Sequence, residues 1–227
     1  MKLIHIIAVL TLLTSCGQVT KKADQESAVA NSTEVEQIKL NLPDTTISFM
    51  WRDLKYDSTL NDSFSSIFLN MDYINTMTSQ EKAAIGYVST FIGNECWWDG
   101  EANDDRSNLD CKIITALGLG YQCSESHLGF LRKWFSTDNE VLAELGDSNC
   151  PTTPYTATIQ DTFSKIVIST KEDSISVYYE ASAVNMREQE SWEWSETVHF
   201  FATTDNLKLI KKDKSEVKLE KFEMTEE

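Results

Sequence analysis

The period of the hydrophobic pattern changes once along the chain, between the residues before 150 and those after Pro154. In the first part, apolar residues recur at intervals of three and four, which is the spacing of one helix face. Residues that cap helices precede these runs. We therefore predict four helices, which begin at Thr78, at Ser107 or Asn108, at Ser124 and at Thr137.

Two of these helices carry the pattern of a capping box at the N-terminus. Thr78 is followed by Glu81, and Thr137 is followed by Glu140. The first helix is expected to run to Gly93, because glycine commonly ends helices.

After Pro154, apolar and polar residues alternate with period two, as in strands with one buried face. The alternation predicts five strands of an antiparallel β-meander, at residues 159–169, 174–184, 190–202, 207–211 and 216–222. In the third strand, one face carries Trp192, Trp194, Val198 and Phe200, and the other carries Glu193, Ser195, Thr197 and His199.

The hydrophobic pattern of residues 38–77, before the predicted helices, is shorter and less regular. Residues 38–42 and 46–51 favour a hairpin around Pro43-Asp44. Residues 60–77 favour a further helix, through Phe64, Ile67, Phe68 and Met71. The chain is therefore predicted to be an α+β protein with an N-terminal hairpin, a disulfide-stapled helical region at about 60–150 and a C-terminal β-meander at about 155–223.

The first residues have the features of an export signal. Lys2 precedes an apolar run of 11 residues, which is too short to span a bilayer. The run ends in Leu13-Thr14-Ser15-Cys16, which resembles the lipobox of bacterial lipoprotein precursors. No functional family is recognised for the rest of the chain. The order of helices and meander is similar to the NTF2-like and cystatin-like class, and this likeness implies no site.

The lipoprotein resemblance implies removal of residues 1–15 as a signal peptide and lipidation of Cys16 with acyl chains such as palmitate. Because Gly17 rather than Asp follows the cysteine, the resemblance implies the outer membrane, and it leaves open which side the protein faces. Residues 17–37 lack aromatic residues, Leu and Ile, so residues 16–37 are expected to form a flexible tether. Residues 38–227 would then be a single domain.

The cysteine count agrees with an exported protein. Five cysteines less Cys16 leave four, and an even number in an exported chain favours disulfides. A metal site is the competing interpretation, but the four cysteines include no C-x-x-C pair. The predicted helices bring the ends of neighbouring segments together. We therefore expect the pairs Cys96–Cys111 and Cys123–Cys150.

The net charge and the motifs of the chain argue against several classes of function. Asp and Glu number 36 against 20 Lys and Arg, and the net charge of −16 argues against nucleic acid as a partner. No dinucleotide, Walker A, G-x-S-x-G or H-E-x-x-H motif is present. The histidines after the signal, His127 and His199, are expected to be structural. No catalytic residue is therefore assigned, and whether the protein is an enzyme stays open.

One acidic segment has oxygen ligands at alternate positions. Asp99, Glu101 and Asn103, with Asp110 beyond them, resemble the calcium loop of an EF-hand. Asp104 stands where that loop needs glycine. A solvated acidic loop without a metal is the competing interpretation, so calcium is the one cofactor considered.

Trp97 and Trp98 adjoin this segment, and with Asp99 and Glu101 they are a candidate recognition surface. We therefore expect a lipid-anchored binding or protein-interaction module of the cell envelope, whose partner is a basic envelope protein or a glycan. The alternative is a hydrolase that acts on glycan or peptidoglycan through carboxylates near these tryptophans. Six lysines at 208–221 either form a site for polyanions or protect an edge strand.

Overall fold

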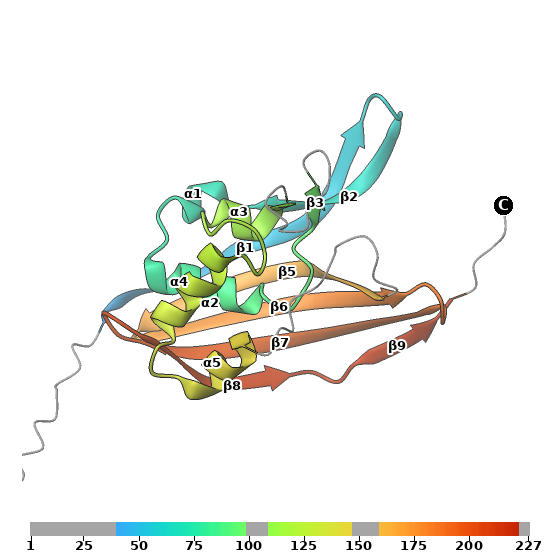
Figure 1. Ribbon diagram of the computed structural model, residues 1–227. Coiled ribbons are helices and arrows are strands. Elements are labelled where there is room, and N and C mark those ends of the chain that lie inside the picture. The colour runs from blue at the N-terminus through green and yellow to red at the C-terminus, as the bar shows by residue number, and fades with distance from the viewer. Residues whose placement is uncertain (1–39, 99–108, 147–158, 223–227) are drawn as a thin grey trace, which may run out of the picture. The chain divides into compact units, whose positions relative to one another are not determined.

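The main sheet of the computed structural model is antiparallel and has seven strands. The structure describes residues 40–98, 109–146 and 159–222. The strand order is β2-β1-β5-β6-β7-β8, and β9 also pairs with β7 (Figure 1). The strands are β1 (Leu42–Asp57), β2 (Asp62–Leu69), β5 (Ile159–Glu172), β6 (Ser174–Asn185), β7 (Glu190–Ala202), β8 (Leu207–Lys214) and β9 (Lys218–Lys221).

The helices lie over one face of this sheet (Figure 1). They are α1 (Met71–Ile74), α2 (Ser79–Val88), α3 (Lys112–Ala116), α4 (Glu125–Trp134) and α5 (Asn139–Gly146). A separate two-stranded sheet contains β3 (Cys96–Trp98) and β4 (Leu109–Cys111). The predicted α+β class is confirmed. No helix among the described residues is long and apolar enough to cross a membrane.

The core fills the space between the helices and the sheet. β7 shows the predicted alternation, because Val198 and Phe200 are buried whereas Thr197 is partly exposed. The Phe200 ring lies 5.8 Å from the ring of Tyr87 on α2 and 5.9 Å from that of Phe135, at the end of α4. Aromatic packing therefore joins the two layers.

An N-terminal hairpin is present, formed by β1 and β2, but its turn follows Asp57. The predicted turn at Pro43-Asp44 is wrong, because both residues lie inside β1. A proline inside a strand removes one donor from the hydrogen-bonded ladder. Here the pairing of β1 with β5 is irregular between Leu42 and Thr45, so no ladder bond is needed from Pro43. Its carbonyl accepts a hydrogen bond of 2.7 Å from the Thr170 hydroxyl instead.

The prediction of one helix through residues 60–77 is wrong over most of its length, because only Met71–Ile74 is helical, as α1. Residues 62–69 form β2, which pairs along its whole length with β1. The helical spacing of the apolar residues misleads here because both faces of this hairpin carry them. Ile67 belongs to the buried core, whereas Phe68 stacks on Trp51 at 6.2 Å on the opposite face.

The helix N-termini agree best with the predictions. Thr78 and Glu81 form the capping box of α2, and Ser124 caps α4. α2 ends at Val88, before the predicted stop at Gly93. α3 begins only at Lys112, because the preceding residues pair in β4.

The predicted capping box at the start of α5 is replaced by a cap from Asp138. One Asp138 carboxylate oxygen accepts from the Val141 amide at 3.2 Å, and the other accepts from the Leu209 amide of β8 at 2.8 Å. A single aspartate therefore caps the helix and joins it to the sheet.

The meander is confirmed from β5 to β8 and wrong at its end. The meander predicts that the strand at 216–222 pairs with the strand at 207–211, but β9 pairs with Glu190–Glu193 of β7 and not with β8. β7 has 13 residues and β8 has eight, so part of β7 remains for another partner. β9 satisfies the backbone groups that would otherwise stay unpaired.

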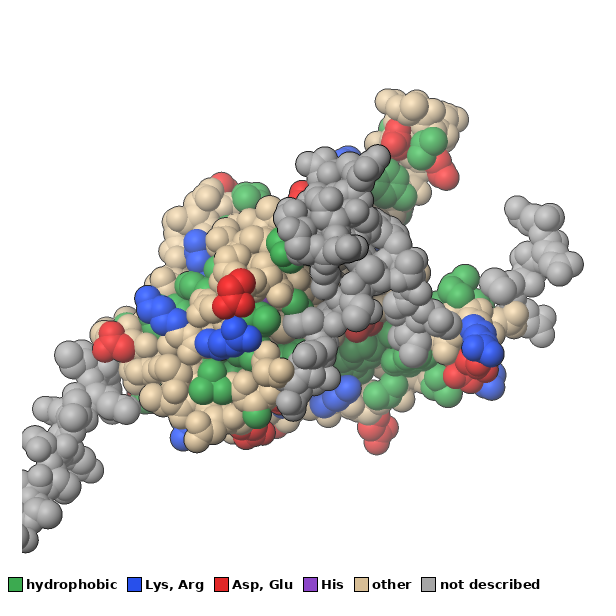
Figure 2. Space-filling model, viewed as in Figure 1, with side chains coloured by type: hydrophobic (Ala, Val, Ile, Leu, Met, Phe, Trp, Pro, Cys, Tyr) green, Lys and Arg blue, Asp and Glu red, His purple; other side chains and the backbone are tan. Residues whose placement is uncertain are grey.

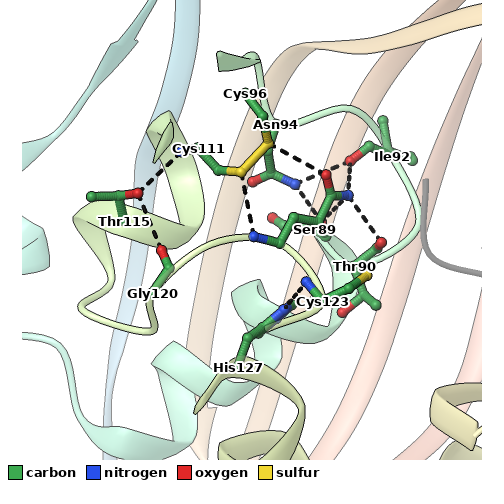
Figure 3. Close-up of a disulfide and its surroundings, with 11 residues drawn as sticks. Ser89, Thr90, Ile92, Asn94, Cys96, Cys111, Thr115, Gly120, Cys123 and His127 are labelled. Atoms are coloured by element: carbon green, nitrogen blue, oxygen red, sulfur yellow. Dashed lines mark hydrogen bonds between the residues drawn. A yellow bond between two sulfur atoms is a disulfide. The ribbon is translucent and has the colours of Figure 1, made fainter. Parts of the chain in front are cut away.

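The predicted disulfide between Cys96 and Cys111 is present (Figure 3). Between it and α2 lies Gln122, whose backbone N–H donates to Cys111 Sγ at 3.3 Å. The Gln122 side-chain amide donates to three carbonyls at and beyond the end of α2, those of Ser89, Thr90 and Ile92. Cys123 is disulfide-bonded as well. The predicted partner Cys150 lies outside the described residues, so that pairing stays a prediction.

His127 is fully buried and lies next to Cys123. Its Nδ1 accepts a hydrogen bond from the Cys123 backbone N–H at 3.1 Å, and its Nε2 lies 3.2 Å from the Gly86 carbonyl oxygen, to which it donates. Burial lowers the pKa of His127 to about 4. The histidine is therefore a neutral structural bridge between α2 and α4.

We expect acid to destabilise the fold through His127. The unfolded chain binds a proton there near pH 6.5, whereas the folded chain does so only near pH 4. The stability is therefore complete above pH 6.5 and is lost as the pH falls towards 4, by about 2 kcal/mol between pH 7 and 4.5. Urea unfolding at pH 7 and at pH 4.5 should show this loss of unfolding free energy in the parent chain and not in His127→Gln. Equal losses in both would contradict it.

Candidate functional site

A cavity of about 290 Å³ lies between the helical layer and the sheet. We call it the inter-layer pocket. Its described lining residues are Tyr87, Val88, Phe91, Ile92, Glu144, Tyr179, Glu196, Val198 and Lys212. Apolar side chains thus surround a few convergent polar groups, which is the usual composition of a small-molecule site.

An ion pair stands at the more exposed side of the pocket. Lys212 Nζ of β8 lies 2.9 and 3.1 Å from the two carboxylate oxygens of Glu144 on α5. The Tyr87 phenol donates a hydrogen bond to the same carboxylate, and the Lys212 ammonium lies 5.2 Å from the centre of the Tyr87 ring. Burial first, and then the Glu144 carboxylate, raises the pKa of Tyr87. The phenol therefore stays protonated as a donor.

A second carboxylate lies deeper in the pocket. Glu196 stands between the inward-facing Trp194 and Val198 on β7, and it is only 9% exposed. Its Oε2 accepts a hydrogen bond of 3.0 Å from the Tyr179 phenol of β6. Burial, followed by the Glu196 charge, raises the pKa of Tyr179, so this phenol also stays a donor. The pocket therefore holds an acidic group that is largely removed from water.

The predicted recognition surface is only partly described. Trp97 and Trp98 lie in β3, where they pair with Asp110 and Leu109 of β4, and the Trp97 side chain is exposed. Asp99, Glu101 and Asn103 lie outside the described residues, so the predicted calcium loop and the binding role of these residues stay predictions. Within the described ranges, no cluster of three or more His, Cys, Asp or Glu could hold a metal ion.

The glutamate before β3 belongs to an ion-pair network. Glu95 contacts the Arg52 guanidinium through one carboxylate oxygen, and the other lies 3.1 Å from Lys112 Nζ. Arg52 Nε also donates to the Phe163 carbonyl oxygen at 2.7 Å. Both carboxylate oxygens of Glu95 are therefore engaged in ion pairs within the chain.

A serine, a histidine and an aspartate meet on the opposite, open face of the sheet. Ser176 Oγ lies 2.9 Å from His199 Nδ1, and His199 Nε2 lies 3.1 Å from Asp213 Oδ2. β6 and β7 each pair with strands on both sides, so their backbone N–H groups are used in the sheet. Lys211 Nζ, 2.6 Å from Asp213 Oδ2, competes for the same carboxylate. We assign this group to the surface polar network rather than to catalysis.

The six lysines at 208–221 follow the β8–β9 edge of the sheet. They do not act as one patch, because Lys212 pairs with Glu144 in the pocket whereas Lys211 pairs with Asp213 on the open face. Edge protection is therefore the better account of most of them.

The paired end of β1 and β2 projects from the body of the molecule (Figures 1 and 2). It exposes several apolar side chains, which are Leu54, Tyr56, Leu60 and Phe64. Leu54 and Phe64 lie on opposite faces of the hairpin, because Leu54 pairs with Ser65 and Phe64 with Lys55. These side chains therefore do not form one continuous apolar surface.

The sequence did not identify the pocket residues as a group. Glu144, Tyr179, Glu196 and Lys212 come from four separate elements, and no short motif joins them. One signal was available, because Glu196 falls between Trp194 and Val198 on the predicted inward face of a strand. A charged residue at such a position is unusual and indicates a buried polar site.

Comparisons of the chain with protein-family models, with curated protein sequences and with solved structures give no match. The similarity to the NTF2-like and cystatin-like class therefore stays a prediction. Functional inference rests on the geometry of the pocket and on the sequence.

Proposed function

We propose that this chain is a lipid-anchored binding protein of the bacterial cell envelope, attached through Cys16, and that its folded domain takes a ligand in the inter-layer pocket. The observation that carries the binding role is the pocket itself, a cavity of about 290 Å³ with both apolar walls and convergent polar groups. This volume suits a small molecule or one large side chain of a protein partner.

The anchoring part of the proposal rests on the lipobox resemblance at Leu13-Thr14-Ser15-Cys16. More than one acyl chain would make membrane attachment durable. In the native host, Cys16→Ala should abolish incorporation of labelled palmitate and move the protein to the soluble fraction. Unchanged labelling would contradict this attachment.

The alternative of a carboxylate-dependent hydrolase gains no argument from the described residues. Asp99 and Glu101 lie outside them, and Glu95 is held by Arg52 and Lys112. The alternative therefore stays a prediction from the sequence.

The pocket can be tested with three probes of the same shape and different charge, which are benzyl alcohol, benzylamine and benzoate. We expect at least one to bind saturably to the full chain in a mild detergent, with detergent-only titrations subtracted. Val88→Phe fills the pocket from α2 and should weaken that binding at least tenfold. Leu54→Phe enlarges an exposed side chain on the hairpin, away from the pocket, and should not change it.

Absence of saturable binding for all three probes would overturn the pocket proposal. So would equal affinity in Val88→Phe, provided that its circular dichroism spectrum and thermal transition show a folded protein.

A further inference from the structure

We propose that the inter-layer pocket is selective for a cation, an ammonium or guanidinium group on an apolar or aromatic body, and that Glu196 is its anionic anchor. This inference rests on the proposed binding function and adds the chemical class of the ligand.

The first argument is that Glu196 is buried and makes no ion pair with any described residue. Its one side-chain partner there is the Tyr179 phenol, at 3.0 Å. A charge that is largely removed from water loses hydration free energy, which a single neutral hydrogen bond offsets only in part. An ammonium or guanidinium ligand would supply the missing opposite charge.

The second argument is that the nearby lysines are engaged elsewhere. Lys212, the one basic residue of the described lining, forms its ion pair with Glu144. Lys214, opposite Glu196 in the β7–β8 ladder, lies 5.2 Å from the Trp194 ring centre and makes no ion pair with Glu196. The described lining therefore carries a net charge of one negative, centred on Glu196.

The third argument is the aromatic wall. The rings of Tyr87 and Phe91 meet edge to face at 5.6 Å, and Tyr179 completes the wall beside Glu196. The faces of aromatic rings attract cations. The pocket already shows this chemistry within the chain, because Lys212 lies over the Tyr87 ring while it pairs with Glu144. A cationic ligand at Glu196 would likewise contact a carboxylate and an aromatic ring.

The fourth argument concerns which ligands the pocket would reject. Both phenols donate their protons to carboxylates, so they can offer a ligand only acceptor lone pairs. An anionic ligand would meet the Glu196 charge without a free donor from either phenol. The net charge of −16 on the whole chain would also attract cations and repel anions at long range.

The test compares benzylamine, benzyl alcohol and benzoate at pH 7, where the amine is protonated. The full chain in detergent should bind benzylamine at least tenfold more tightly than benzyl alcohol, and benzoate most weakly. In Glu196→Gln, which keeps the shape of the side chain, benzylamine should bind at least tenfold more weakly, whereas benzyl alcohol should change less than twofold.

The matched control is Glu193→Gln, which removes the same charge from the opposite face of β7. It should leave the affinity of benzylamine within twofold of the parent. Equal affinity for the alcohol and the amine, or an unchanged amine affinity in Glu196→Gln, would overturn cation selectivity and leave the pocket proposal standing. An equal loss of benzylamine affinity in Glu196→Gln and Glu193→Gln would also overturn cation selectivity, because the total charge of the chain would then matter rather than Glu196. The proposed function itself would be overturned by the absence of binding for all three probes or by unchanged affinity in folded Val88→Phe.

Discussion

Replacement of Tyr87 by alanine is expected to lower the free energy of unfolding by about 4 kcal/mol, as for other large aromatic residues truncated in a core. Tyr87 is 1% exposed, and its ring contacts those of Phe91, Phe135 and Phe200. The truncation would leave a cavity where α2 meets the sheet. It would also remove the phenol that donates to Glu144.

Urea unfolding followed by tryptophan fluorescence would measure this loss. Tyr87→Phe keeps the ring packing and should cost only about 1 kcal/mol, for the hydrogen bond. Tyr56→Ala removes an exposed tyrosine of the hairpin and should change stability by less than about 0.5 kcal/mol. Similar midpoints for Tyr87→Ala and Tyr56→Ala would show that Tyr87 does not join the layers.

Loss of the Cys96–Cys111 disulfide is expected to cost about 3 kcal/mol, because the bond closes a short loop and restricts the unfolded chain. The two cysteines are 15 residues apart, and both are buried beside Gln122. In a chain of this size such a loss corresponds to a fall in the melting temperature of about 10 °C.

The measurement is thermal unfolding of the Cys96→Ser/Cys111→Ser double variant without reductant, which leaves the disulfide of Cys123 intact. A further treatment with reductant should then lower the melting temperature of both chains, because Cys123 is also disulfide-bonded. A double variant that melts with the parent chain would contradict a stabilising role for this disulfide.

The helix caps were predictable because they are local. Thr78 with Glu81 and Ser124 each satisfy backbone N–H groups within their own first turn, and nothing distant is needed to place them. Where a cap serves a second element, local reasoning selects the wrong residue. Asp138 replaces Thr137 at the start of α5 because its carboxylate also binds the Leu209 amide of β8.

The strands after Pro154 were predictable for a similar reason. β5, β6 and β7 each bury one face in the core, so their residues alternate between apolar and polar with period two. β2 has no such simple pattern, because its two faces meet different surroundings. Ile67 contacts the core, whereas Phe68 packs on Trp51, and their mixed spacing resembles that of a helix. Pairing with β1 decides the conformation of this segment.

By itself, the sequence determined the α+β class, the starts of α2 and α4, the meander from β5 to β8 and the Cys96–Cys111 pair. These features depend on contacts within one element or between neighbours in the chain. The tertiary structure alone decided the extension of β1 through Pro43, the course of β9 along β7 and the inter-layer pocket. Each of these depends on backbone and side-chain groups from distant segments that satisfy one another only after the layers have packed.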